Sequence, residues 1–244
     1  TFALGLQAWI AVNQQQWKSG IRTATQAIFK SKQNSSRNSQ ELQRWVYPYL
    51  IIALEKAVVT KQASDVERRI QEFIAQVPSN SFAWGFRGWK QAIQGLWIDA
   101  IYNFEQASRK SQVAGWILIN QGITQENLQN LPAAIQVYES YIQKFSPDAL
   151  VLFRLGTLYG QTGEWKKAKS HLEKAVQLRS DYAEAYHNLG WVLLNIKDNN
   201  GQVENFREIL SAYRKAAGLY NQQQKVAYYQ SIKQAFLAVG IENI

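Results

Sequence analysis

The chain has 244 residues and a net charge of +9, and 46% of its residues are apolar, which is enough for a folded core. It contains no cysteine, so disulfides, thiolate metal sites and a cysteine nucleophile are excluded. No apolar run reaches the length of a membrane span. Because the sequence begins at Thr1 rather than at methionine, we expect a processed product or, preferably, a fragment of a longer protein. Composition leaves the cellular compartment open, with a cytoplasmic location favoured.

Apolar residues recur with the helical period almost without interruption along the chain. The expected helices span residues 3–15, 18–30, 42–60, 64–76, 81–95, 98–110, 115–128, 131–144, 148–161, 165–178, 182–196, 203–220 and 223–239. The stretch 31–41 contains no apolar residue that could pack, so we expect a polar linker or loop there.

Glycine recurs at one fixed interval, at Gly88, Gly122, Gly156 and Gly190. Two further ladders keep this interval: an alanine lies twelve positions after the glycine, and a large residue lies sixteen positions after it. In one copy these residues are Ala168 and Leu172, which follow Gly156. Small residues let two helix backbones approach, and the large residue fills the space beside them. The ladders therefore predict a repeated, closely packed helix pair.

The interval and its residues resemble the tetratricopeptide repeat (TPR), whose pattern runs W-x2-L-G-x2-Y, then A-x3-F, then P. The copy most similar to this pattern comprises Leu152, Leu155, Gly156, Tyr159, Gly163, Ala168, Leu172 and Ala175. The resemblance implies an all-α fold, a right-handed α-solenoid of antiparallel helix pairs, with about six pairs and a C-terminal capping helix. The next copy regains register seven residues late, at Tyr213, because Lys197–Asn205 is expected to be an inserted loop.

This resemblance also gives an expected organisation of the chain. A divergent N-terminal helix pair over 1–30 is followed by the linker over 31–41 and a degenerate repeat over 42–80. Four repeats then cover 81–114, 115–148, 149–182 and 183–220, and a capping helix with a tail occupies 221–244.

Sequence signatures of catalysis do not occur in this chain. It has no phosphate-binding loop, dinucleotide fingerprint, paired-histidine metal motif or serine-hydrolase elbow. The two histidines, His171 and His187, lie on different helices of the repeat, and we expect His171 at the surface. We therefore predict a non-enzymatic protein with no catalytic residue, no metal and no cofactor.

In TPR proteins the first helix of each pair lines a concave face along which peptides lie. At the position two before the ladder glycine, the chain changes from apolar Ile52 and Phe86 to polar residues, namely Asn120, Arg154 and Asn188. At the position five after it, the change runs from Val59 and Ile93 to Asn127, Gln161 and Asn195. We expect the apolar positions to be buried. Side-chain amides can pair with an extended peptide backbone, and Arg154 could hold a carboxylate.

Aromatic and neighbouring side chains complete the predicted partner-binding face. The full set is Trp89, Trp116, Asn120, Asn127, Phe153, Arg154, Thr157, Gln161, His187, Asn188, Trp191 and Asn195.

Three functions are compatible with these features. The first is a protein–protein interaction scaffold that binds a peptide or protein along the concave face. The second is an intramolecular regulatory or self-association module attached to a catalytic or membrane domain. The third is nucleic-acid binding through the basic surface, which is disfavoured because lysines and glutamates alternate as on an ordinary solvated helix face. The sequence does not predict an oligomeric state.

Overall fold

The structure is a computed structural model that describes residues 2–32, 45–46, 49–50, 53, 81–110 and 113–238. The chain divides into two compact units, Thr1–Phe86 and Arg87–Ile244. The first unit contains the antiparallel helices α1 (Phe2–Asn13) and α2 (Trp17–Lys32), which pack against each other. The division of the chain after Phe86 falls within helix α5 (Ser81–Ile93).

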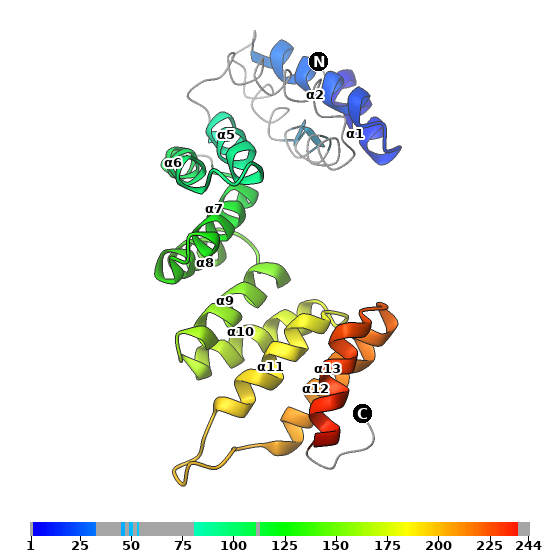
Figure 1. Cartoon of the computed structure of the whole chain (residues 1–244). Helices are drawn as coiled ribbons and strands as arrows, with labels where there is room; N and C mark the ends of the chain where they lie inside the picture. Colours follow the sequence, from blue (N-terminus) through cyan, green and yellow to red (C-terminus); the bar gives the residue numbers. More distant parts are fainter. Residues whose placement is uncertain are drawn as a thin grey trace. The chain divides into compact units, whose positions relative to one another are not determined.

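The second unit is a succession of helices, each of which packs against the next one in the chain (Figure 1). Helices α6 and α7 span Trp97–Ser108 and Gly115–Asn127, and α8 and α9 span Leu131–Lys144 and Ala149–Gln161. They are followed by α10 (Trp165–Leu178), α11 (Ala183–Asn195), α12 (Phe206–Gln222) and α13 (Val226–Ala238). Helix α9 also contacts α11, the next first helix along. This arrangement is the expected all-α solenoid of helix pairs.

Short turns with one left-handed residue join the helices of a pair. The middle residues of three turns, Gly95, Gln129 and Gly163, have φ of 77°, 57° and 79° and are spaced at the interval of the glycine ladder. The residue after each of them donates a backbone hydrogen bond to the carbonyl five residues earlier, at 2.9, 2.9 and 2.8 Å. Such a bond satisfies a carbonyl at the end of the first helix and reverses the chain. The repeat therefore extends to the backbone conformation of its turns.

The ladder glycines lie directly beneath the large residue of the second helix. A Cβ atom at Gly156 would lie 2.5 Å from Cγ of Leu172, and one at Gly122 would overlap Cε1 of Tyr138. At Gly190 the nearest atom would be Cε2 of Tyr213, at 2.8 Å. No side chain fits at these positions, so glycine sets the separation of the two helices. Tyr213 therefore packs against Gly190, as the sequence predicted when it placed the large residue of this repeat seven positions late.

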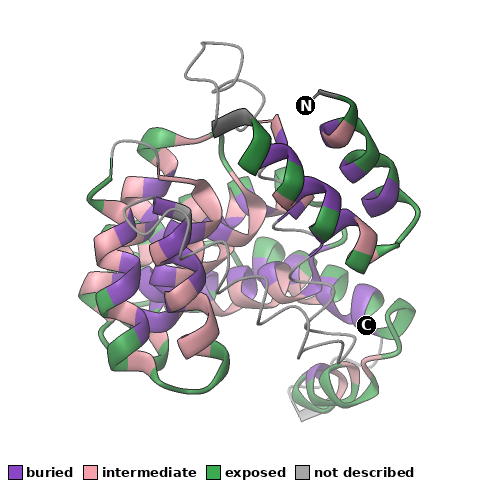
Figure 2. Ribbon diagram, turned by 90° about the horizontal axis from the view of Figure 1, so that it is seen from above, coloured by how far each residue is buried: buried purple, intermediate pink, exposed green. Residues whose placement is uncertain are grey.

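The core of the second unit follows from this packing. The alanines of the second ladder, Ala100, Ala134 and Ala168, are fully buried, as are Phe104, Tyr138 and Leu172 of the third. Figure 2 shows buried and exposed residues on different sides of individual helices. Phe86 is also buried as predicted, but Ile93 is 56% exposed, so the expectation of burial at Ile93 was wrong. Ile93 is the last residue of α5 and points into solvent beside the turn.

The segment between α11 and α12 replaces the three-residue turn with a longer, ordered loop. Lys197 and Val203 form an isolated antiparallel bridge, and Gly201 has φ of 77°. The Asp198 carboxylate accepts hydrogen bonds from the backbone N–H groups of Asn200 and Gln202, both at 2.8 Å. Val203 packs against the hydrophobic core, and this contact fixes the inserted loop to the rest of the second unit. Helix α12 begins three residues later than predicted because Val203 belongs to this loop.

Parts of the predicted N-terminal organisation lie outside the described residues. This applies to the expected helix over 64–76, to most of the helix over 42–60 with Ile52 and Val59, and to the linker beyond Lys32, where α2 ends. None of the described helices combines the length and the apolar character that a membrane span needs.

Candidate partner-binding surface

One stripe of side chains runs along each of the first helices α7, α9 and α11. In α11 it carries Asn188, Trp191 and Asn195, which lie at intervals of three or four residues and therefore on one helix face. We call the combined stripes the first-helix surface, and its members are Trp116, Asn120 and Asn127 of α7, Arg154, Thr157 and Gln161 of α9, and Asn188, Trp191 and Asn195 of α11.

Asparagine side chains on this surface have fixed orientations. The Nδ2 atom of Asn120 donates to the Trp116 carbonyl at 2.8 Å, and that of Asn127 donates to the Ile123 carbonyl at 2.9 Å. Asn195 makes the same contact with the carbonyl four residues earlier, at 2.8 Å. A side-chain amide has two N–H groups and one carbonyl, so this single bond orients the group and leaves it capacity for a partner.

Two contacts on the surface link one repeat to the next. Nδ2 of Asn188 donates to Oγ1 of Thr157 at 2.8 Å, which joins α11 to α9. Nη1 of Arg154 lies 2.9 and 3.0 Å from the two carboxylate oxygens of Glu126, which joins α9 to α7. Arg154 was predicted to receive a partner's carboxylate, and in the structure a carboxylate of its own chain occupies that position.

Glu126 is a neighbour of the candidate residues that the sequence interpretation missed. Its Oε1 atom also accepts a hydrogen bond from the Tyr138 hydroxyl at 2.5 Å, so one carboxylate joins α7, α8 and α9. Burial, and then the negative charge of Glu126, raise the pKa of Tyr138 far above its usual value. The signal available in the sequence was a lone acid on α7 one turn after Gly122, opposite the lone arginine of α9.

The aromatic candidates pack mainly between helices. A Cβ atom at Gly160 would lie 2.5 Å from Cζ3 of Trp191, and the Trp191 ring meets Trp165 edge-on at 5.3 Å. His187 is turned toward α12, with its ring 5.6 Å from that of Tyr213.

Three further aromatic candidates lie elsewhere in the solenoid. Trp89 and Trp116 are half-buried on α5 and α7. The Phe153 ring lies 4.8 Å from that of Tyr182, beside a pocket. Trp191 thus packs against the preceding repeat, whereas His187 packs within its own repeat. Of the aromatic candidates, Phe153 lines a pocket.

The first pocket, the α9–α11 pocket, has a volume of about 450 Å³. Its lining residues are Leu150, Phe153, Arg154, Arg179, Asp181, Tyr182, Glu184, Gln223 and Lys225. The Arg179 guanidinium lies 3.2 Å from the centroid of the Tyr182 ring, and Lys225 is paired with Glu184. Among the described residues no carboxylate lies within ion-pair distance of Arg179, so this cation can accept a partner's acidic group.

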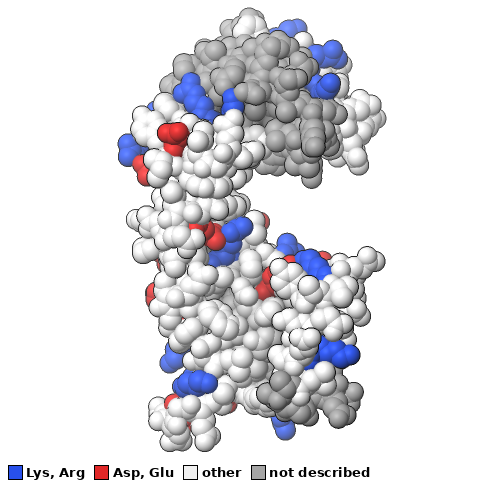
Figure 3. Space-filling model, in the orientation of Figure 1, with Lys and Arg blue, Asp and Glu red and all other residues white. Residues whose placement is uncertain are grey.

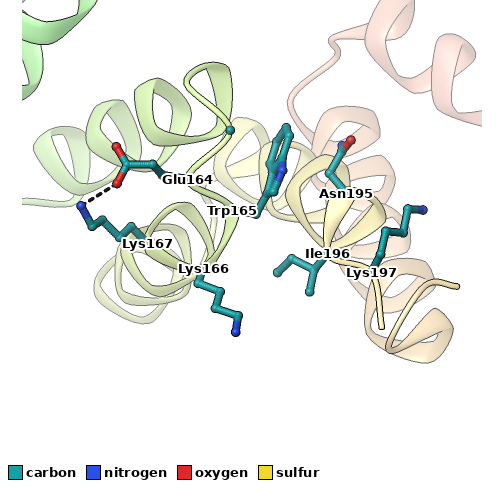
Figure 4. Close-up of a pocket in the computed structure, with 8 residues that line it drawn as sticks. Glu164, Trp165, Lys166, Lys167, Asn195, Ile196 and Lys197 are labelled. Atoms are coloured by element: carbon teal, nitrogen blue, oxygen red, sulfur yellow. Dashed lines mark ion pairs between the residues drawn. The ribbon is translucent and has the colours of Figure 1, made fainter. Parts of the chain in front are cut away.

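The second pocket, the insertion pocket, has a volume of about 410 Å³ and lies between the α9–α10 turn and the end of α11 (Figure 4). Its lining residues are Gly163, Glu164, Trp165, Lys166, Lys167, Asn195, Ile196 and Lys197. Lys167 pairs with Glu164 at 2.6 Å. The pocket therefore has three lysines against one glutamate, beside an indole ring.

Charge over the visible face is scattered. Figure 3 shows lysine and arginine groups in several separate places, with acidic groups among them. Within the described ranges, no group of three or more histidine, aspartate or glutamate side chains is placed to hold a metal ion.

Comparisons with known proteins agree with this architecture. Residues 148–222 match the tetratricopeptide repeat family model. The chain is similar to YrrB, described as a TPR protein with an unusual peptide-binding site, with a TM-score of 0.58 and 16% identity over 75% of this chain and 89% of that one. It is also similar to MamA (41-end) from Desulfovibrio magneticus RS-1, with a TM-score of 0.56 and 18% identity over 66% of this chain and 86% of that one.

A third similar structure is the APC/C hetero-tetramer Cut9–Hcn1, with a TM-score of 0.57 and 18% identity over 92% of this chain and 43% of that one. No curated protein sequence matches the chain. At these identities the structural similarity establishes the fold alone, and the family match covers residues 148–222. The resemblance noted in the sequence is thus confirmed: residues 148–222 match the tetratricopeptide repeat model, and the described helices form a TPR-type solenoid.

Proposed function

We propose that the chain is a non-catalytic protein-interaction scaffold that binds an extended segment of a partner protein along the first-helix surface. The observation that carries the proposal is the set of oriented amides. Asn120 and Asn127 on α7 and Asn195 on α11 each donate to the carbonyl four residues earlier in their own helix, so the three amides are held in the same way on two first helices. An extended peptide presents N–H and carbonyl groups in alternation, and amides pair with both kinds whatever the peptide's side chains are.

The α9–α11 pocket supplies a place for an anchoring side chain. The rings of Phe153 and Tyr182 give it an apolar wall, and Arg179 gives it an available cation. Buried aromatic contacts and arginine contribute disproportionately to binding energy in interfaces. The similarity to YrrB supports the proposal, since that protein is described as having a peptide-binding site.

The test begins with peptides selected from a random displayed library against the chain, whose affinities are measured by isothermal titration. The double variant Asn127→Ala/Gln161→Ala removes two exposed amides of the first-helix surface. Each lost hydrogen bond costs roughly 0.5–1.5 kcal/mol, so we expect binding about tenfold weaker.

The matched control is Gln143→Ala/Gln177→Ala, which removes two exposed amides from the second helices α8 and α10. This control should bind as the unmodified chain does. The proposed surface is wrong if the control weakens binding and the first-helix variant does not. A library that yields no binder would favour the self-association alternative, which sedimentation velocity of the chain measures directly.

A further inference from the structure

We infer that the insertion pocket is a second contact site for the partner segment and takes an acidic side chain next to an apolar one. The inference rests on the proposed function, because Asn195 belongs both to the first-helix surface and to this pocket. It adds the chemistry of the recognised segment and assigns a role to the inserted loop.

The apolar part of the pocket is well defined. Trp165 is half-buried, and the edge-on contact with Trp191 at 5.3 Å fixes the position of its ring. Figure 4 shows Trp165 and Asn195 projecting to the same side, and Ile196 lying between Lys166 and Lys197. An apolar side chain placed here would contact the indole ring while its neighbour reaches the lysines.

The charged part of the pocket has more basic than acidic side chains. Lys167 is engaged by Glu164, as Figure 4 shows. In the described part of the chain, no carboxylate lies within ion-pair distance of Lys166 or Lys197, and both side chains are exposed. An acidic group from outside the chain would complete the charge balance, and its attraction to lysines at the surface would weaken with salt.

The insertion places one of these two lysines. The left-handed turn residues Gly95, Gln129 and Gly163 are evenly spaced along the sequence, and one further step of the same length leads to Lys197. Lys197 does not have the left-handed conformation of these three residues, and it pairs with Val203 in a loop that Asp198 closes. The backbone of Lys197 is therefore held at the rim of the pocket by the loop that this repeat alone carries among the helix pairs described.

A peptide acid fits this pocket better than a phosphate does. Phosphate sites in proteins are usually built from several free backbone N–H groups, whereas the loop N–H groups of Asn200 and Gln202 already donate to Asp198. The two pockets also lie toward opposite ends of α11, since Glu184 lines one and Asn195 lines the other. Eleven helical residues rise about 16 Å, which is about five residues of extended peptide. We therefore expect a segment with two acidic residues about five positions apart.

The experiment uses a fluorescein-labelled decapeptide with glutamates at positions 3 and 8, leucines at positions 4 and 9, and glycine and serine elsewhere. A second peptide has glutamine in place of both glutamates. Fluorescence anisotropy should show that the full chain binds the acidic peptide at least about fivefold more tightly than the glutamine peptide. Carbodiimide coupling followed by mass spectrometry should join a peptide glutamate to Lys166 or Lys197.

Charge-matched variants separate the pocket from the net charge of +9. Lys166→Ala/Lys197→Ala should weaken binding of the acidic peptide about fivefold. Lys174→Ala/Lys215→Ala removes the same charge from exposed positions on α10 and α12 and should leave the affinity within about twofold.

Two results would overturn the inference. One is equal binding of the acidic and glutamine peptides. The other is an equal loss in both lysine pairs, which would show general attraction to a basic chain. Neither result touches the first-helix surface, whose separate test uses library-selected peptides and the exposed amides.

Discussion

The helix pairs α9–α10 and α11–α12 each have the same kind of packing contact between their two helices, but the two pairs differ in the segment that connects these helices. Gly156 lies beneath Leu172 in the first pair, and Gly190 lies beneath Tyr213 in the second. The first pair is joined by a three-residue turn, whereas the second is joined by the bridged loop from Ile196 to Asn205. The close approach survives the change of connection because it depends on the residues at the contact. The connection is therefore the part of a repeat that can acquire a pocket.

The largest expected effect tests whether the contact is independent of the connection. Gly156→Leu and Gly190→Leu should each destabilise the second unit by roughly 1–3 kcal/mol or more, because even an added Cβ atom would lie 2.5 Å from Leu172 or 2.8 Å from Tyr213. Urea unfolding followed by circular dichroism measures both losses. A large loss at Gly156 with none at Gly190 would show that the longer loop lets α12 move aside.

A smaller effect separates the two links between repeats. Arg154→Ala leaves the Glu126 carboxylate without its guanidinium partner, so we expect a loss of about 2 kcal/mol in the free energy of unfolding. Asn188→Ala removes a neutral hydrogen bond to Thr157 and should cost about 1 kcal/mol.

A double-mutant cycle with Glu126→Gln isolates the coupling at Arg154. If Arg154→Ala and Asn188→Ala unfold alike, the carboxylate is solvated too well for the link to contribute.

Each of the two helix pairs also contains one half-buried histidine. Burial lowers the pKa of His171, helped by Lys174, and burial lowers the pKa of His187, both from 6.5. Above pH 6.5 both histidines are largely unprotonated in the folded chain and in the unfolded chain, so burying them as neutral rings costs no loss of a proton. As the pH falls through 6.5 toward the folded-state pKa values, the unfolded chain binds more protons, so stability is lost.

The melting temperature measured from pH 7.5 to pH 5.5 tests this dependence. His171→Phe keeps a ring against Tyr159, and His187→Phe keeps a ring against Tyr213. Each variant should lose less stability across this range than the unmodified chain does, and the effect should occur in both pairs. Identical pH profiles for the variants and the unmodified chain would contradict the assignment.

The smallest expected effect concerns the turns. Gln129 and Gly163 occupy equivalent turns with φ of 57° and 79°. The left-handed conformation strains residues that have a Cβ atom, so Gln129→Gly should stabilise the chain by at most about 1 kcal/mol and Gly163→Gln should destabilise it by a similar amount. Thermal unfolding of both variants gives the comparison, and opposite signs are the expected result.

The sequence predicted the helices and the glycine ladders because close packing needs particular residue sizes at fixed positions. Gly190 and Tyr213 could be matched across an insertion for that reason. The same reasoning failed at Ile93, whose apolar side chain lies in solvent at the end of α5. Helical period alone does not tell whether a neighbouring helix covers the last residue of an element.

The polar residues of the first-helix surface could be assigned to their helices from the sequence, but their hydrogen bonds and ion pairs could not be predicted. Asn120 and Asn195 were placed on the correct helices, yet the partner of Arg154 was not identified. A salt bridge depends on the rotation of two helices about their axes, which the period of the repeat does not specify. The pocket beside Lys197 depends on how the inserted loop folds back, and no ladder describes that loop.

The most direct test of the account is hydroxyl-radical footprinting of the chain with and without a library-selected peptide. We predict that oxidation falls at Phe153 on α9 and at Leu194 on α11, an exposed residue that adjoins Asn195. Oxidation at Leu178, which is 56% exposed at the end of α10, should stay unchanged. Protection at Leu178 with none at Phe153 and Leu194 would place the partner on the second helices and contradict the proposed surface.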